Sequence, residues 1–205
     1  MAKYHWTAVP AKDEDVLIEK LNNATSSKIL TKGRTHVSIA DVPFYKNFKL
    51  AQATTYSTIP PVSMRFLIGG DFSDLTVVRM NGTNEPIFEN NVNAGLVLNT
   101  DTVVPYVTFV MESVQSEEGC LRLVEAVDDD TFTQTPTPEE RKKVTRLIRP
   151  AKVAETDDGF VVDAIMLYGD TVFRTEIAVK KDGHIDIVND EKLAEGLPIR
   201  PIFLE

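Results

Sequence analysis

The fold class is decided by residues 159–188, GFVVDAIMLYGDTVFRTEIAVKKDGHIDIV. Apolar and polar side chains alternate in its middle part, where Phe173 and Ile177 fall on one face and Arg174 on the other. Such alternation is typical of an antiparallel strand with one packed face and one solvated face. Two glycine-containing turn segments interrupt the pattern. The stretch therefore predicts a three-stranded antiparallel meander with strands at residues 159–167, 171–180 and 184–188.

The sequence before this meander predicts helices as well as strands. Residues 12–21 predict a helix, because acidic residues occupy the first turn and Val16, Leu17 and Leu21 can form an apolar stripe. Residues 102–114 have a strand-like composition but a helical spacing of apolar side chains, and we predict a helix there. Strands are predicted at residues 35–39, 48–57, 62–68, 75–80, 86–89, 95–98 and 119–127.

A capping-box pattern marks another helix. Thr137 is followed by Pro138 at the first helical position and by Glu140 three residues later, which is the arrangement that satisfies two backbone N–H groups reciprocally. This helix should end before Pro150, and a short helical turn is predicted at 191–195. Together these elements predict an α+β fold, mainly antiparallel sheet, with two to four helices and a C-terminal three-stranded meander.

The predicted domain organisation is a single domain, residues 1–205. The alternative is two closely packed lobes, residues 1–130 and 138–205. The segment 128–138, DDDTFTQTPTP, would join these lobes, because it is acidic and rich in threonine and proline.

Composition excludes several classes of function. The net charge is −9, and residues 57–130 carry all of it, with 12 acidic and 3 basic side chains. Binding to nucleic acid or to an anionic membrane surface is not expected, because both need clustered Lys and Arg. The single cysteine, Cys120, excludes an internal disulfide, and no apolar segment is long enough to span a bilayer. A cytoplasmic location is the resulting expectation.

Familiar catalytic and metal-binding motifs are absent from the sequence. There is no phosphate-binding glycine loop, no Gly-x-Ser-x-Gly elbow and no His-x-x-x-His pair. The acidic run 128–130 lacks the glycine and glutamate of a calcium loop. We therefore expect no metal and no cofactor, and we expect Cys120 to be a buried structural thiol.

Three arginines form the best candidate for a ligand site. Arg65, Arg79 and Arg122 are the only basic residues between 57 and 130, and each stands between two apolar residues of a predicted strand. On one interpretation they share a sheet face and bind an anion, since the guanidinium group pairs well with carboxylates. On the other, each points into solvent and forms a surface ion pair with a nearby glutamate. Tyr56 is the aromatic residue most suited to line a pocket, because its hydroxyl needs a partner.

The predicted function is a non-catalytic module that binds a small anionic ligand or a protein partner, with self-association as a further expectation. The alternative is an enzyme that holds a small anionic substrate through the three arginines. A purely structural scaffold is the third hypothesis, and it predicts no pocket for a ligand.

Overall fold

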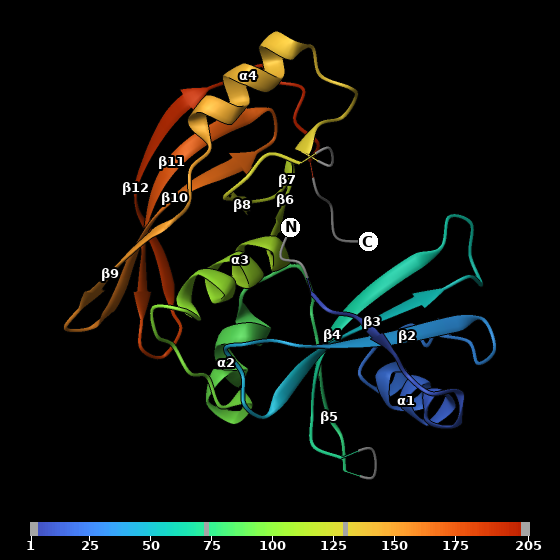
Figure 1. Ribbon diagram of the computed structural model, residues 1–205. Helices are drawn as coiled ribbons and strands as arrows, with labels where there is room; N and C mark the ends of the chain where they lie inside the picture. The colour runs from blue at the N-terminus through green and yellow to red at the C-terminus, as the bar shows by residue number, and fades with distance from the viewer. Residues whose placement is uncertain (1–3, 72–73, 129–130, 202–205) are drawn as a thin grey trace. The chain divides into compact units, whose positions relative to one another are not determined.

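Four α-helices and antiparallel sheets make up the described part of the chain, which confirms the predicted α+β class and the C-terminal meander. The computed structural model describes residues 4–71, 74–128 and 131–201 (Figure 1). By their internal contacts, the described residues up to 97 and those from 98 onward form two compact units, named here the N-terminal unit and the C-terminal unit.

The N-terminal unit is built on a five-stranded antiparallel sheet. Its strands follow the chain order: β1 (Thr7–Ala8), β2 (Thr35–Asp41), β3 (Phe48–Thr55), β4 (Val62–Gly69) and β5 (Thr76–Arg79). Helix α1 (Ala11–Asn23) covers one face of this sheet. Leu17 and Leu21 of α1 belong to the same buried cluster as Phe66 of β4.

The apolar stripe of α1 differs by one residue from the prediction. Ile18 is buried beside Leu17 and Leu21, whereas Val16 is 48% exposed. A second tie joins the helix to the sheet, because Glu14 Oε1 accepts a hydrogen bond from the backbone N–H of Val37 at 2.9 Å. The polar first turn therefore fixes the helix on β2, and the apolar stripe lies over the strands.

Helix α2 (Glu85–Ala94) occupies residues 86–89, where the sequence predicted a short strand, and that prediction was wrong. Of the strand predicted at 95–98, the structure contains a single β-bridge, between Leu96 and Tyr45. Ile87, Asn91 and Ala94 are the buried positions of α2, and their spacing is that of one helical face. Tyr45 Oη donates to Asn91 Oδ1 at 2.7 Å, which holds the helix to the unit. The helix escaped prediction because the face that it buries contains only two apolar side chains.

The C-terminal unit has a second antiparallel sheet, in the order β12-β11-β10-β8, with β9 also paired to β10. Helix α3 (Val103–Ser113) precedes it and confirms the helix predicted at 102–114. Tyr106 of α3 is fully buried, and its Oη donates to the carbonyl oxygen of Gly183 at 2.8 Å. The strands of this sheet are β8 (Arg122–Val124), β9 (Lys152–Thr156), β10 (Gly159–Tyr168), β11 (Thr171–Lys180) and β12 (Ile185–Ala194). A separate two-stranded sheet consists of β6 (Gln115–Ser116) and β7 (Gly119–Cys120).

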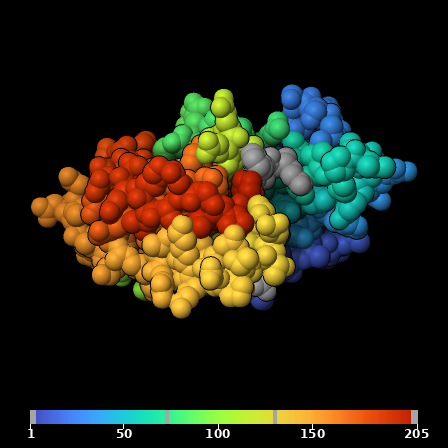
Figure 2. All heavy atoms as spheres, turned by 90° about the horizontal axis from the view of Figure 1, so that it is seen from above, coloured from blue at the N-terminus to red at the C-terminus, as the bar shows by residue number. Residues whose placement is uncertain are grey.

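The last strand of the meander is longer than predicted. A helical turn was expected at 191–195, but β12 continues to Ala194. Pairing with β11 places Glu191 opposite Arg174, so opposite charges meet across the strands. The strand lies at the surface, where its atoms are drawn in red in Figure 2. Tertiary pairing therefore overrides the helical tendency of a Glu-, Lys- and Leu-containing segment.

Helix α4 (Pro138–Leu147) begins with the predicted capping box. Thr137 Oγ1 accepts from the backbone N–H of Glu140 at 3.2 Å, and Glu140 Oε2 accepts from the N–H of Thr137 at 2.8 Å. The bond from the Thr137 backbone lowers the pKa of the Glu140 carboxyl below its ordinary value. Val144 is buried and packs in a core cluster that includes Ile165 and Leu167 of β10.

The segment 128–138 lies within the C-terminal unit. Residues 129 and 130 of the predicted acidic run are outside the described part of the chain. Phe132 is buried and forms a β-bridge with Ile199. Strand β8 before the segment pairs with β10 after it. The segment is thus an internal connection that contributes to the core of this unit.

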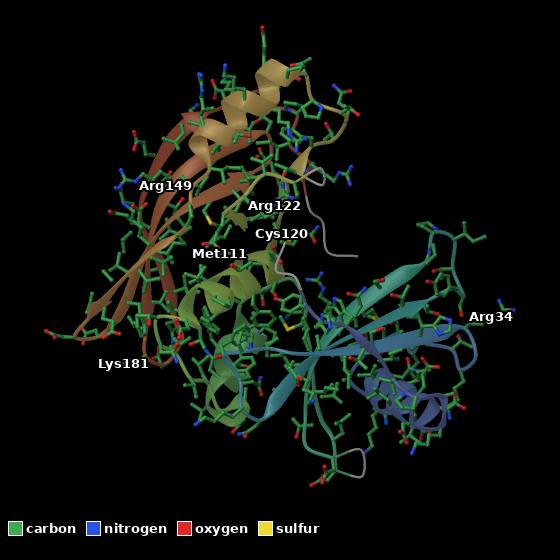
Figure 3. All side chains as sticks on the ribbon, viewed as in Figure 1. Arg34, Met111, Cys120, Arg122, Arg149 and Lys181 are labelled. Atoms are coloured by element: carbon green, nitrogen blue, oxygen red, sulfur yellow. The ribbon has the colours of Figure 1, made fainter. Side chains whose placement is uncertain are left out.

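One carboxylate, Asp163, binds two arginines in the C-terminal unit, and we call this group the carboxylate clamp. Asp163 of β10 accepts hydrogen bonds from Arg149 at 2.9 and 2.8 Å, and from Arg174 of β11 at 3.2 and 3.1 Å. Arg149 is labelled in Figure 3. The hydrogen bond from Arg174 lowers the pKa of Asp163, and the charge of Arg149 lowers it further. One acid therefore ties the chain after α4 to two strands.

None of the helices in the described residues is both long and apolar enough to cross a membrane.

Candidate functional site

The three predicted arginines do not share one sheet face. Arg65 and Arg79 lie on β4 and β5 of the N-terminal unit, and Arg122 lies on β8 of the C-terminal unit. Arg79 is opposite Phe66, whereas Arg65 precedes Phe66 along the strand. Since neighbouring residues of a strand point to opposite faces, Arg65 and Arg79 project from opposite faces of their sheet.

Tyr56 lies just after β3 and is 55% exposed. Its ring packs edge-on against His36, with 5.9 Å between the ring centroids. The structure thus places Tyr56 on the surface of the N-terminal unit, away from the element that carries Arg79. A ligand-binding role for Tyr56, Arg65 or Arg79 stays a prediction.

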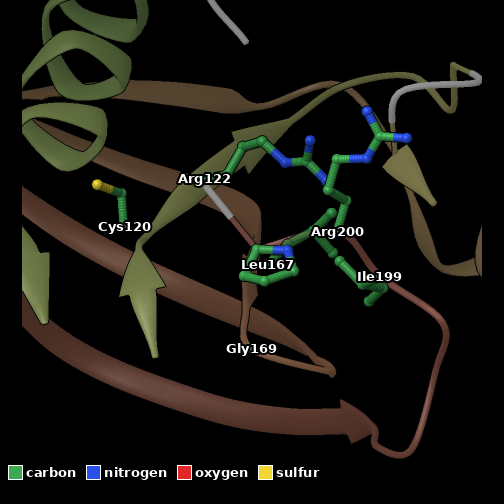
Figure 4. A pocket seen from close by; sticks show the side chains of 7 residues that line it. Cys120, Arg122, Leu167, Gly169, Ile199 and Arg200 are labelled. Atoms are coloured by element: carbon green, nitrogen blue, oxygen red, sulfur yellow. The ribbon is translucent and has the colours of Figure 1, made fainter. Parts of the chain in front are cut away.

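A small pocket in the C-terminal unit contains the remaining predicted residue, Arg122. It is a shallow recess with a cavity volume of about 10 Å³, and the space around it opens to solvent. Figure 4 shows this pocket at close range, with Arg122 and Arg200 reaching into the same region. The lining residues are Cys120, Arg122, Leu167, Gly169, Ile199, Arg200 and Pro201.

Strand β8 positions Arg122. The residue is opposite Leu167 of β10 and is only 3% exposed. Its guanidinium Nη2 donates to the carbonyl oxygen of Thr131 at 3.4 Å. Because Arg122 lies inside an antiparallel pair and under the 131–133 segment, its charge is held at a fixed place in a poorly hydrated environment.

Arg200 reaches the same pocket from the C-terminal segment. Its backbone N–H donates to the carbonyl oxygen of Thr131 at 2.9 Å, and its Nε donates to the carbonyl oxygen of Phe132 at 3.1 Å. The bridge between Phe132 and Ile199 holds this segment in place. The carbonyl of Thr131 therefore accepts hydrogen bonds from both arginines, one through a side chain and one through the backbone.

Asp128 supplies negative charge near the pocket. Burial raises the pKa of its carboxyl, but the hydrogen bond from Thr131 Oγ1 at 2.9 Å and the charge of Arg122 outweigh it and lower the pKa overall. Asp128 is consequently ionised at neutral pH. It stands beside the pocket and is not one of its lining residues.

The other walls of the pocket are apolar. Leu167 and Ile199 are buried and belong to the core cluster of this unit. Cys120 is also buried, as expected of a structural thiol. Gly169 has φ +55°, and a Cβ there would lie 2.7 Å from Glu118 Oε2. The left-handed φ favours glycine at this wall, and no side chain fills the pocket from it.

The arrangement offers hydrogen-bond donors and positive charge. The described lining residues include no histidine and no carboxylate that could transfer a proton near neutral pH. No group of three His, Cys, Asp or Glu side chains in the described ranges is placed to hold a metal ion. The described lining thus offers two guanidinium groups, one thiol and apolar side chains.

Sequence reasoning missed Arg200. No role was predicted for the C-terminal tail, in which Arg200 stands between Pro198 and Pro201. An arginine held in an extended, proline-flanked segment was the available signal. What the sequence could not show is that this segment pairs with residues 131–133, which lie more than 60 positions earlier in the chain.

Comparison with known proteins gave no match to a protein-family model, a curated protein or a solved structure.

Proposed function

We propose that the chain is a non-catalytic binding protein whose pocket at Arg122 and Arg200 takes a small anion. The observation that carries the proposal is that two arginines from separate segments line one pocket, and that one of them is almost fully buried. A guanidinium group in a poorly hydrated site makes strong charge-assisted hydrogen bonds. An anion from solution gains charge-assisted hydrogen bonds there.

The geometry supports binding better than catalysis for a physical reason. Acid–base catalysis needs a group whose pKa lies near the working pH and within hydrogen-bond reach of the substrate. Arginine stays protonated under all ordinary conditions and so cannot exchange a proton with a ligand. The pocket can therefore orient and neutralise an anion, and its described lining offers no general base.

Titration of the purified full chain with sodium phosphate, sulfate and short carboxylates, at constant ionic strength, tests the proposal. Calorimetry should show saturable binding by at least one of these anions. At a hundredfold excess of free anion over Kd, linkage contributes about 2.7 kcal/mol of stability, so the Tm should rise by several degrees. Sodium chloride serves as the reference salt.

Two substitutions locate the site. Arg122→Met should weaken anion binding at least about tenfold, since hydrogen bonds to charged groups contribute about 1.5–3 kcal/mol. Arg200→Met should also weaken it, and because Arg200 is exposed, this variant tests the site with little risk to folding. Arg146→Met removes the same charge from the exposed face of α4 and should leave binding unchanged. Binding that survives both pocket substitutions would overturn the proposal.

The proposal also retains a cytoplasmic location and self-association as predictions. Light scattering on the eluting protein tests self-association directly, and a mass of one chain across a hundredfold range of concentration would contradict it.

A further inference from the structure

The sheet of the N-terminal unit has a second face, opposite α1, that is polar over part of its area. Val37, Ala53 and Phe66 belong to the core cluster beneath α1. Because side chains alternate between the two faces of a strand, the residues next to these three point to the other face. That face carries one exposed residue, His36, and five half-buried ones, Ser38, Gln52, Thr54, Ser63 and Arg65. We call these six residues the polar face.

The strand register brings the side chains of the polar face into rows. Gln52 of β3 pairs with Ser38 of β2 on one side and with Arg65 of β4 on the other. Thr54 of β3 pairs with Ser63 of β4, and their hydroxyl oxygens are hydrogen-bonded at 2.7 Å. Hydroxyl and amide groups both donate and accept hydrogen bonds, so these rows can bind the N–H and C=O groups of a peptide.

Two further residues continue the polar face beyond the ends of β2 and β3. The backbone N–H of Tyr56 donates to the carbonyl oxygen of Arg34 at 2.8 Å, so the two residues lie opposite each other. Both are exposed. Arg34 and Arg65 are therefore four residues apart along the strands and two strands apart, which is about 16 Å. An extended peptide covers that distance with about five residues.

The polar face carries positive charge without a carboxylate from its own strands. Arg65 forms no ion pair or side-chain hydrogen bond with a described residue. Asp41 is the only acidic residue of strands β1 to β5, and alternation along β2 places it on the α1 side, where it pairs with Lys49. Glu14 of α1 lies 3.8 Å from His36 Nδ1, but it already accepts a hydrogen bond from a backbone N–H of β2. The guanidinium group of Arg65 can therefore bind a carboxylate from another molecule.

The composition of this surface fits a protein partner better than a nucleic acid. Protein interfaces are enriched in arginine and tyrosine and depleted in lysine, aspartate and glutamate, and Arg34, Arg65 and Tyr56 match that pattern. Affinity for a phosphate backbone depends on the number of phosphates neutralised. Two arginines on a chain with a net charge of −9 neutralise few of them.

We propose that the polar face binds an acidic segment of a partner protein, with one carboxylate at Arg65 and a second, about five residues away, at Arg34. Ser38, Gln52 and the Thr54–Ser63 pair contact the backbone of the segment between the two carboxylates. This surface and the anion pocket at Arg122 belong to different units.

Titration of fluorescein-labelled hexaglutamate with the purified full chain, followed by fluorescence anisotropy at low ionic strength, tests the proposal. Saturable binding with a Kd below about 1 mM is expected. Added sodium chloride should weaken it, because salt screens exposed charges. Labelled hexaglutamine has the same length without the charge and should not bind.

Two substitutions on the polar side of the sheet should weaken hexaglutamate binding. Arg65→Met should raise the Kd at least about tenfold, as expected for the loss of hydrogen bonds to a charged group. Arg34→Met should raise it by a smaller factor, because this arginine is exposed and its ion pair is screened. Arg79→Met is the matched control, since it removes the same charge from the α1 side of the same sheet and should leave the Kd unchanged. Circular dichroism checks that each variant is folded.

Four results would overturn the proposal. The first is an equal loss of affinity in Arg79→Met and Arg65→Met, because any positive charge would then suffice. The second is the absence of saturable hexaglutamate binding, or equal binding of hexaglutamine. The third is tighter binding of a labelled oligothymidylate of the same length, which would indicate a nucleic-acid surface. The fourth is loss of hexaglutamate binding in Arg122→Met but not in Arg65→Met, which would place the peptide at the anion pocket.

Discussion

The N-terminal and C-terminal units both cover an antiparallel sheet with a helix, but they treat the charged residues of the sheet differently. Arg65 and Arg79 of the N-terminal unit make no ion pair or side-chain hydrogen bond with any described residue. In the C-terminal unit, Asp163 is clamped by two arginines, and Arg122 is buried beside a pocket. Each of the three arginines Arg65, Arg79 and Arg122 stands between two apolar residues in sequence. The elements packed against each strand therefore decide whether such an arginine is buried and whether it forms an ion pair.

Truncating a buried side chain of α1 should have the largest effect on stability, and it tests whether the two units unfold independently. Leu17→Ala should destabilise the N-terminal unit by about 2–5 kcal/mol, because Leu17 is fully buried and the cavity cannot be refilled. Hydrogen exchange measured by mass spectrometry should show lost protection in β3 and β4, with β10 and β11 unchanged. Val16→Ala, on the exposed side of α1, should change stability by less than about 0.5 kcal/mol.

An equal loss of protection in β10 and β11 of Leu17→Ala would show that both units unfold together. The comparison between them would then describe two parts of one cooperative structure.

Removing the Asp163 carboxylate should have an intermediate effect on stability. It tests whether paired arginines of the C-terminal unit stabilise the fold more than the arginines of the N-terminal unit do. Asp163→Asn should lower the Tm at pH 7 by about 2–4 °C, since two arginines lose a shared carboxylate that is partly screened by solvent. Arg65→Met in the N-terminal unit, where no described residue pairs with the arginine, should leave the Tm nearly unchanged. Thermal unfolding followed by circular dichroism measures both.

The effect of Asp163→Asn should also depend on pH. Arg174 and Arg149 lower the pKa of Asp163 in the folded state, so this group stabilises the fold above its unfolded pKa of about 3.9. That stability is lost as the pH falls through the lower, folded pKa. The difference in Tm between wild type and variant should therefore shrink below about pH 4. A difference that stays constant down to pH 2 would contradict the ion-pair explanation.

The smallest expected effect comes from the caps of two helices, one in each unit. Thr137→Ala should destabilise the C-terminal unit by about 1 kcal/mol, because it removes the capping box of α4. Asn84→Ala at the N-cap of α2 should cost less, since Asn84 makes no side-chain cap bond. Chemical denaturation of both variants measures the difference, and a larger loss for Asn84→Ala would reverse the expected order.

Much of the fold was predictable because its signals are local. Alternation in 159–188 predicted the meander, the spacing of apolar residues predicted α3, and the Thr137 pattern predicted α4 with its cap. Helix α2 was missed because one of its three buried positions is polar, and Asn91 there accepts a hydrogen bond from the distant Tyr45. The extended form of residues 191–194 was missed because it depends on pairing with β11.

The candidate site was predictable only in part. Arg122 was identified because arginine is unusual inside an apolar strand, but the same reasoning selected Arg65 and Arg79, which lie on another sheet. Arg200 was not identified, because its relation to Arg122 exists only through the pairing of residues 131–133 with the C-terminal segment.

The sequence by itself determined the fold class, since hydrophobic periodicity and capping residues act over a few positions and need no knowledge of the remaining chain. Only the tertiary structure decided which arginine is buried, which is paired and which lines a pocket. Those properties depend on residues that are distant in sequence and adjacent in space. Burial changes the cost of a charge by several kcal/mol, so the environment of each arginine sets what it can do.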